Sequence, residues 1–101
     1  MHKTIKNKLT QLQKLCQKYD VKTMYLFGSA CTDEFNQDSD IDIMIEFKDL
    51  SIEKYTDNYF KLHYDLEDLF NRKIDLITTK SITNPYLKQS IEETRELLYA
   101  A

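Results

Sequence analysis

Two aspartates, Asp40 and Asp42, stand one residue apart in a mostly apolar run that covers residues 40–45. The alternating isoleucines predict a β-strand, whose side chains point to opposite faces in turn, so both carboxylates project on the same face. Two such charges a few ångströms apart repel each other by about 3 to 4 kcal/mol near a protein surface. A hard cation offsets this repulsion, because Mg²⁺ binds one or two carboxylates and completes its shell with water and phosphate oxygens. The pair therefore indicates one half of a site for a metal-bound nucleotide.

Gly28 and Ser29 indicate the other half of this site. They follow an apolar run at residues 24–27 that predicts another strand, and Gly28 is the only glycine in the chain. A glycine lets the backbone turn sharply and lets a ligand approach the main chain. Ser29 can cap a following helical turn, whose free N–H groups bind anions such as phosphate. The sequence thus predicts a phosphate-binding turn next to the carboxylate pair.

Other polar residues fit simpler roles. Asp33, Glu34 and Asp38 lie in the polar connection of residues 32–39 and are interpreted as surface loop residues rather than as ligands. His63 lies on the predicted apolar stripe of a helix, with no second histidine at metal-binding spacing, which indicates a packed or hydrogen-bonded side chain. The candidate site therefore depends on the strand aspartates and on the turn.

The Gly-Ser pair, ten further residues and then Asp-x-Asp resemble the signature of the nucleotidyltransferase superfamily, which includes DNA polymerase beta and the aminoglycoside nucleotidyltransferases. Over nearly its whole length the chain is most similar to the minimal nucleotidyltransferase (MNT) proteins. The resemblance implies that two Mg²⁺ ions bind the catalytic carboxylates, and that Gly28 and Ser29 bind the nucleotide. It also implies a third carboxylate from a later strand, and the implied catalytic residues and metal ligands are then Asp40, Asp42 and Asp75.

Asp75 lies in a predicted strand between Ile74 and Leu76, an unusual place for a charged residue. The alternative for Asp75 is a salt bridge to a lysine such as Lys73, or a position at the edge of the sheet. The chain departs from the family at residues 30–34, where many relatives carry an arginine and this sequence reads Ala-Cys-Thr-Asp-Glu.

The resemblance implies an antitoxin that transfers AMP from ATP to a tyrosine hydroxyl of a cognate HEPN-domain toxin. A hetero-oligomer of the two proteins is then expected. The alternative is a regulatory binding protein that neutralises its partner by masking it, with weak catalysis or none. A phosphatase that uses Asp-x-Asp with the first aspartate as nucleophile is disfavoured for two reasons. That chemistry does not require a Gly-Ser pair upstream, and its fold is larger than 101 residues allow.

Length and composition bound the remaining possibilities. The 101 residues are expected to form one domain, residues 1–101, with an ordinary composition of 42% hydrophobic and 31% charged residues. No apolar stretch of about 18 residues and no signal-peptide pattern occurs, so a cytoplasmic protein without a membrane span is expected. The net charge of -3 argues against direct binding of nucleic acid. Cys16 and Cys31 are interpreted as reduced thiols without a disulfide or a zinc site.

Hydrophobic spacing predicts the order helix, strand, strand, helix, strand, helix. The predicted helices cover residues 1–20, 52–71 and 85–98, and the strands lie at residues 24–27, 40–47 and 72–79. The second helix is expected to bury a stripe every three or four residues, and this stripe comprises Ile52, Tyr55, Tyr59, His63, Leu66 and Leu69 or Phe70. The fold class is α/β (α+β): a small mixed β-sheet with helices packed on one face, as in the polymerase beta-like nucleotidyltransferases.

Overall fold

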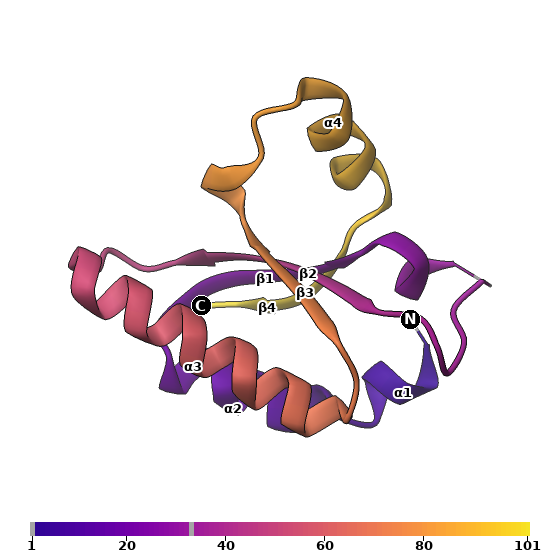
Figure 1. The fold of residues 1–101 in the computed structure, drawn as a ribbon, viewed down its shortest axis with the longest axis horizontal. Coiled ribbons are helices and arrows are strands. Elements are labelled where there is room, and N and C mark those ends of the chain that lie inside the picture. Colours follow the sequence, from indigo (N-terminus) through magenta and orange to yellow (C-terminus); the bar gives the residue numbers. More distant parts are fainter. Residues whose placement is uncertain (1, 33) are drawn as a thin grey trace.

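Four strands form one mixed sheet in the order β3-β2-β1-β4 (Figure 1). The computed structural model describes residues 2–32 and 34–101, so the loop residue Asp33 lies outside the described residues. The helices are α1 (Lys3–Lys6), α2 (Leu9–Lys18), α3 (Ile52–Phe70) and α4 (Pro85–Thr94). The strands are β1 (Val21–Phe27), β2 (Ile41–Phe47), β3 (Ile74–Thr78) and β4 (Glu96–Ala100). Short 3₁₀ helices, η1 (Gly28–Cys31) and η2 (Thr79–Ser81), follow β1 and β3.

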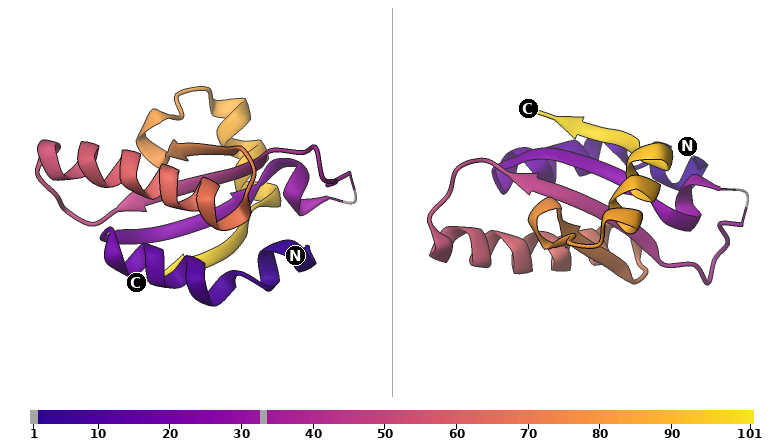
Figure 2. Two further views of the ribbon diagram at one scale, coloured as in Figure 1. Left: turned by 60° about the horizontal axis from the view of Figure 1, so that its bottom comes forward. Right: turned by 90° about the horizontal axis from the view of Figure 1, so that it is seen from above.

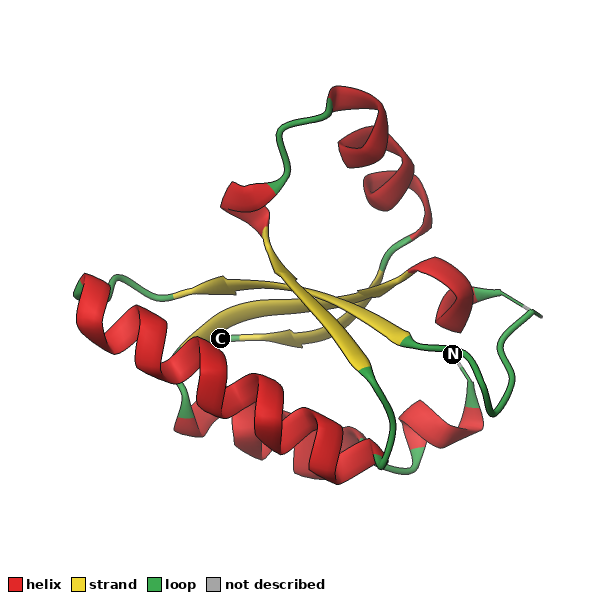
Figure 3. Cartoon of the chain, viewed as in Figure 1, coloured by secondary structure: helices red, strands yellow, loops and turns green. Residues whose placement is uncertain are grey.

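The strand directions require one long crossover. β1 is antiparallel to both β2 and β4, whereas β2 and β3 are parallel. Parallel neighbours need a long connection, and α3 provides it. The helices α2 and α3 cover one face of the sheet, while α4 stands on the other side (Figures 1 and 3). Two further views show the same separation (Figure 2). The predicted mixed sheet of the α/β (α+β) class is therefore confirmed, and α4 is the exception to the predicted packing of the helices on one face (Figure 1).

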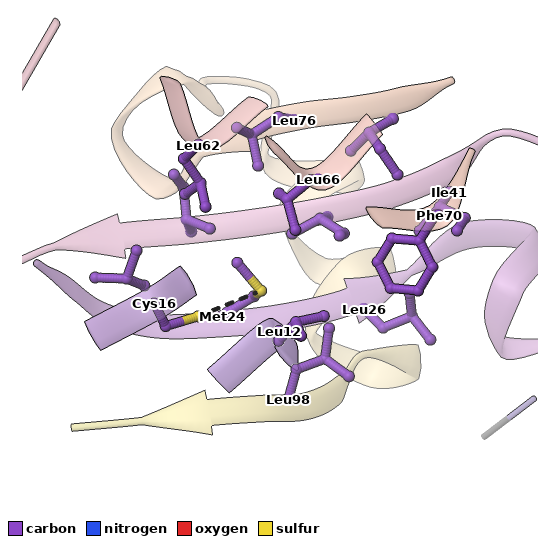
Figure 4. Packing of buried hydrophobic residues seen from close by; sticks show 14 of the residues in the cluster. Leu12, Cys16, Met24, Leu26, Ile41, Leu62, Leu66, Phe70, Leu76 and Leu98 are labelled. Carbon is purple, nitrogen blue, oxygen red and sulfur yellow. Dashed lines mark hydrogen bonds between the residues drawn. The ribbon is translucent and has the colours of Figure 1, made fainter. Parts of the chain in front are cut away.

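The core lies between the sheet and the pair α2 and α3 (Figure 4). The alternation predicted for β2 is observed, because Ile41, Ile43 and Ile45 are fully buried on the face that meets the helices. Cys16 of α2 is also fully buried, and burial raises the pKa of its thiol to about 12. Its thiol contacts the sulfur of Met24 at 3.7 Å. Both cysteines are free thiols, as predicted.

The buried stripe of α3 is rotated from the predicted one. Ile52 is 86% exposed, and the buried residues of α3 are Asn58, Leu62, Leu66 and Phe70. Asn58 can be buried because its side-chain N–H donates a hydrogen bond of 2.9 Å to the carbonyl oxygen of Tyr19. The aromatic residues with polar tips therefore lie at the rim of the core, and the prediction for Ile52 was wrong.

Side chains of α3 cover the outer edge of β3. The hydroxyl of Tyr59 donates to the carbonyl oxygen of Leu76, and Nε2 of His63 donates to that of Ile74 at 2.8 Å. The backbone N–H of Ile74 donates to a carboxylate oxygen of Glu67 at 3.2 Å. These bonds occupy edge groups that would otherwise be open to another strand. The prediction that His63 is hydrogen-bonded is confirmed.

The C-terminal segment is a strand where a helix was predicted. The helix α4 ends at Thr94, and β4 then pairs with β1, so the predicted helix over residues 85–98 was wrong beyond Thr94. Pairing with β1 satisfies the backbone of β4 and places Leu98, 3% exposed, in the core. This long-range pairing outweighs the local helical spacing.

The N-terminal region also differs in detail from the prediction. The single predicted helix is divided into α1 and α2, with Asn7 as the C-cap of α1. In the part of the chain that the structure describes, no helix combines the length and the apolar character needed to cross a lipid bilayer.

Replacing Leu98 with alanine tests the strand assignment of β4. We expect Leu98→Ala to lower the free energy of unfolding by about 2 to 4 kcal/mol, because it removes a buried side chain. The control is Leu97→Ala, because Leu97 is 53% exposed, and its cost is expected to stay below about 1 kcal/mol. Urea unfolding measures both values. Equal costs at the two positions would contradict the observed alternation.

Candidate active site

The candidate site lies where β1 ends and where β2 and β3 begin. In the sheet register, Phe27 of β1 pairs with Asp42 of β2, and Asp42 pairs with Asp75 of β3. Gly28 directly follows Phe27, so the turn and two of the three predicted carboxylates share one row across three strands. The strand pairing thus brings together residues that are far apart in the sequence.

Position 28 requires a glycine because of its backbone conformation and because the Asp42 side chain lies so close. Its φ of +71° lies in the left-handed region that favours glycine. A Cβ atom at this position would lie 2.2 Å from Oδ2 of Asp42, a distance that no real contact allows. The turn that follows differs from the prediction, because Ser29 lies inside η1 and Phe27 occupies the N-cap position without a side-chain hydrogen bond. The carbonyl oxygen of Ser29 accepts hydrogen bonds from the N–H and the hydroxyl of Thr32.

Asp42 has an unusual protonation equilibrium. Burial raises the pKa of its carboxyl from the ordinary 3.8 to about 6, and the negative charges of Asp75 and Asp40 add to this rise. A hydrogen bond from Asp42 to the side chain of Asp75 also stabilises the protonated form. Asp42 and Asp75 are therefore hydrogen-bonding neighbours, and the ionisation of both brings two negative charges together.

Asp40 and Asp75 are more exposed than Asp42. Asp40 directly precedes β2, and its Oδ2 lies 3.7 Å from Nζ of Lys73. Asp75 is on the edge strand, with its side chain exposed between two buried neighbours, Ile74 and Leu76. The sheet-edge position, one of the two alternatives for Asp75, is therefore observed. The other alternative was a salt bridge from Asp75 to Lys73, but Lys73 contacts Asp40 instead.

The donor set fits a hard divalent cation only in part. No group of three or more histidine, cysteine, aspartate or glutamate side chains in residues 2–32 and 34–101 is arranged to hold a metal ion. Asp42 and Asp75 fit such an ion because they are adjacent carboxylates and Mg²⁺ prefers oxygen ligands. Binding there requires loss of the proton on Asp42. Asp40 could join them, and its Oδ2 lies 3.7 Å from Nζ of Lys73.

Arg72 orders the connection between η1 and β2, a role that the sequence did not suggest. Its Nη1 donates hydrogen bonds of 3.1 Å to the carbonyl oxygens of both Asn36 and Ser39. Its guanidinium also lies over the ring of Phe35, 4.7 Å from the centroid. Arg72 therefore positions the segment that leads into Asp40. A single arginine before a strand carries no sequence signal for such a role.

Comparison with known proteins gives the class of this chain. The family model described as "Polymerase beta, Nucleotidyltransferase" matches residues 10–101. The chain is 47% identical over 85 residues to "Putative protein adenylyltransferase MJ1379" of Methanocaldococcus jannaschii, which covers 84% of this chain and 82% of the relative. It is 32% identical over 90 residues to the protein adenylyltransferase MntA of Thermococcus cleftensis, which covers 86% and 82%. The chain therefore belongs to the polymerase beta nucleotidyltransferase family.

Solved structures share this fold. A crystal structure of a toxin-antitoxin with AMP-PNP superposes with a TM-score of 0.71 at 23% identity, covering 92% of this chain and 73% of that one. A tri-AMPylated Shewanella oneidensis HEPN toxin in complex with MNT antitoxin gives 0.66 at 21% identity, covering 95% and 72%. At these identities the likeness establishes the fold. The family match and the relatives of 47% and 32% identity confirm the prediction of an enzyme of the nucleotidyltransferase class.

Replacing Gly28 with alanine tests the tight contact with Asp42. We expect Gly28→Ala to destabilise the protein by about 1 to 3 kcal/mol, because the new Cβ is strained at this φ and displaces the Asp42 carboxyl. Thermal unfolding measures the loss. The control, Ser29→Ala, adds no such conflict and should unfold within about 0.5 kcal/mol of the wild type. A Gly28→Ala variant as stable as this control would contradict the contact.

Replacing Asp42 with asparagine tests whether the ionised Asp42 carboxylate destabilises the fold. Because the pKa of Asp42 is higher in the folded chain than in the unfolded chain, its ionisation lowers stability as the pH rises from about 4 to 6. In metal-free buffer at pH 8 we expect Asp42→Asn to be more stable than the wild type by on the order of 1 kcal/mol, discounted for solvent screening. The difference should vanish below pH 4. Urea unfolding across pH measures it, and Asp38→Asn serves as the exposed-loop control.

Proposed function

We propose that the chain is an MNT antitoxin that transfers AMP from ATP to a tyrosine hydroxyl of a cognate HEPN toxin. The observation that carries the proposal is the contact between Asp42 and Asp75 beside Gly28, at the junction of three strands. The names of the relatives support AMP transfer to a protein. The toxin-antitoxin structures that share the fold support a HEPN partner and a hetero-oligomer.

The residues of the site would divide metal binding and phosphate binding between them. Two Mg²⁺ ions, when bound, would neutralise the triphosphate and polarise the α-phosphate. Asp42 and Asp75 would hold them, with Asp40 as a further ligand. Gly28 lets the main chain lie against the Asp42 carboxyl, and the backbone of Gly28 and Ser29 would bind the phosphates.

The transfer itself needs one proton acceptor. The acceptor oxygen forms a bond to the α-phosphorus, and the bond from this phosphorus to the bridging oxygen breaks, so that pyrophosphate leaves. Asp75 is the proposed base for the hydroxyl proton, because its side chain is exposed on the edge strand, where a partner can approach.

The acceptor is proposed to be a protein because of the apolar side chains that α4 and β4 expose. The helix α4 and the strand β4 expose large apolar side chains, with Tyr86 82% exposed and Leu97 53% exposed. Apolar side chains of this size are enriched at the centres of protein interfaces. The net charge of -3 opposes a phosphate backbone as the partner.

A masking antitoxin is the second candidate function. It is favoured by the arrangement of Asp40, which faces Lys73, and by the absence of a complete three-ligand metal cluster in the described parts of the chain. In this case the partner would be neutralised by binding alone.

Incubation of the purified pair with ATP and Mg²⁺ separates the two functions. We expect the mass of the partner to increase by one or more AMP groups, and the substitution of Asp40 and Asp42 by alanine together should reduce this transfer by at least about 100-fold. Mass spectrometry of the intact partner measures the change, with Asp38→Ala as the control. If the partner stays unmodified while the doubly substituted chain still neutralises it, masking is the function.

A further inference from the structure

The proposed nucleotide site is crowded with negative charge. Three aspartates lie at the site, and a nucleoside triphosphate adds about four more charges at neutral pH. The turn η1 contains no basic residue. Charge-assisted hydrogen bonds from Arg or Lys are the usual way in which proteins bind phosphates. The cation that assists the phosphates must therefore come from another element.

Two cations near the site already have partners. Arg72 is held by the loop carbonyls and by the ring of Phe35, and its hydrogen bonds order the loop. Lys73 lies beside Asp40. Arg72 and Arg95 are the two arginines of the chain. Arg95 is thus the remaining guanidinium.

Arg95 lies between α4 and β4 with its guanidinium on an aromatic face. The guanidinium carbon is 4.2 Å from the ring centroid of Tyr25. This contact with the Tyr25 ring holds the plane of the guanidinium. The flat stacking leaves the N–H groups at the edges of the guanidinium able to donate to a ligand.

Arg95 is also close to the row that contains Asp42. Tyr25 pairs with Met44, the residue two positions beyond Asp42 on the same face of β2. Diagonal neighbours of this kind lie about 7 to 8 Å apart, within the reach of a long side chain. On the other side, α4 packs against η1, and the backbone of Glu96 hydrogen-bonds the thiol of Cys31. The guanidinium therefore lies on the face of the sheet that carries Asp42, over a ring that is a diagonal neighbour of Asp42.

We propose that Arg95, stacked on Tyr25, binds the β- and γ-phosphates of ATP at this site. The inference rests on the proposed nucleotidyltransferase function and adds a phosphate-binding residue to it. Arg95 binds the two phosphates that leave as pyrophosphate. It therefore strengthens the binding of ATP and not the binding of AMP, which lacks these phosphates. Tyr25 is a positioning residue that holds the guanidinium plane.

Calorimetric binding of ATP and of AMP, each with Mg²⁺, tests this assignment on the full chain. Arg95→Ala should weaken ATP binding about 10- to 100-fold, as expected for lost charge-assisted hydrogen bonds, while AMP binding stays within about twofold of the wild type. Arg95→Lys keeps the charge and should recover part of the ATP affinity. Tyr25→Leu should weaken ATP binding selectively, and Tyr25→Phe should not. Thermal unfolding checks that each variant is folded.

Lys61→Ala is the charge-matched control, because Lys61 pairs with Asp57 on the exposed surface of α3. Unchanged ATP binding in Arg95→Ala, or an equal loss of ATP and AMP binding, would overturn the role of Arg95. The nucleotidyltransferase assignment would still stand if Asp42→Ala abolished ATP binding in the same assay. A wild-type chain that binds no ATP would instead overturn the proposed function itself.

Discussion

The contact between the carboxyls of Asp42 and Asp75 is the constraint on which the rest of the site depends. The parallel pairing of β2 and β3 places the two residues side by side, and partial burial prevents water from screening their charges fully. The chain thus folds with a local electrostatic cost that a divalent cation would remove. Gly28 completes the constraint, because any side chain there would enter the volume of the Asp42 carboxyl.

The sheet separates stability from chemistry by its two faces. The face that carries Ile41, Ile43 and Ile45 packs against α2 and α3 and forms the main core. The opposite face carries Asp42 and is bordered by α4, of which only Ile91 is buried. The polar face can therefore hold repelling charges because the apolar face supplies most of the folding energy.

The sequence predicts those parts of the structure that local patterns determine. Strand alternation placed Asp40 and Asp42 on the face opposite the buried isoleucines, and the single glycine marked the turn. Long-range pairing was not visible in the same way, because β4 is a strand only by virtue of its hydrogen bonds to β1. The roles of Arg72 and Arg95 likewise depend on contacts with aromatic rings distant in the sequence. No periodicity indicates such contacts.

The hydrogen bonds that α3 makes to the outer side of β3 determine how another polypeptide can approach Asp75. The carbonyl oxygens of Ile74 and Leu76 already accept bonds from His63 and Tyr59. An incoming chain therefore cannot extend the sheet at these groups, and main-chain recognition, which tolerates almost any sequence, is closed there. Under the proposed function, a protein substrate would have to present a protruding side chain to this edge, and selectivity would come from the shape and chemistry of that side chain and its surroundings.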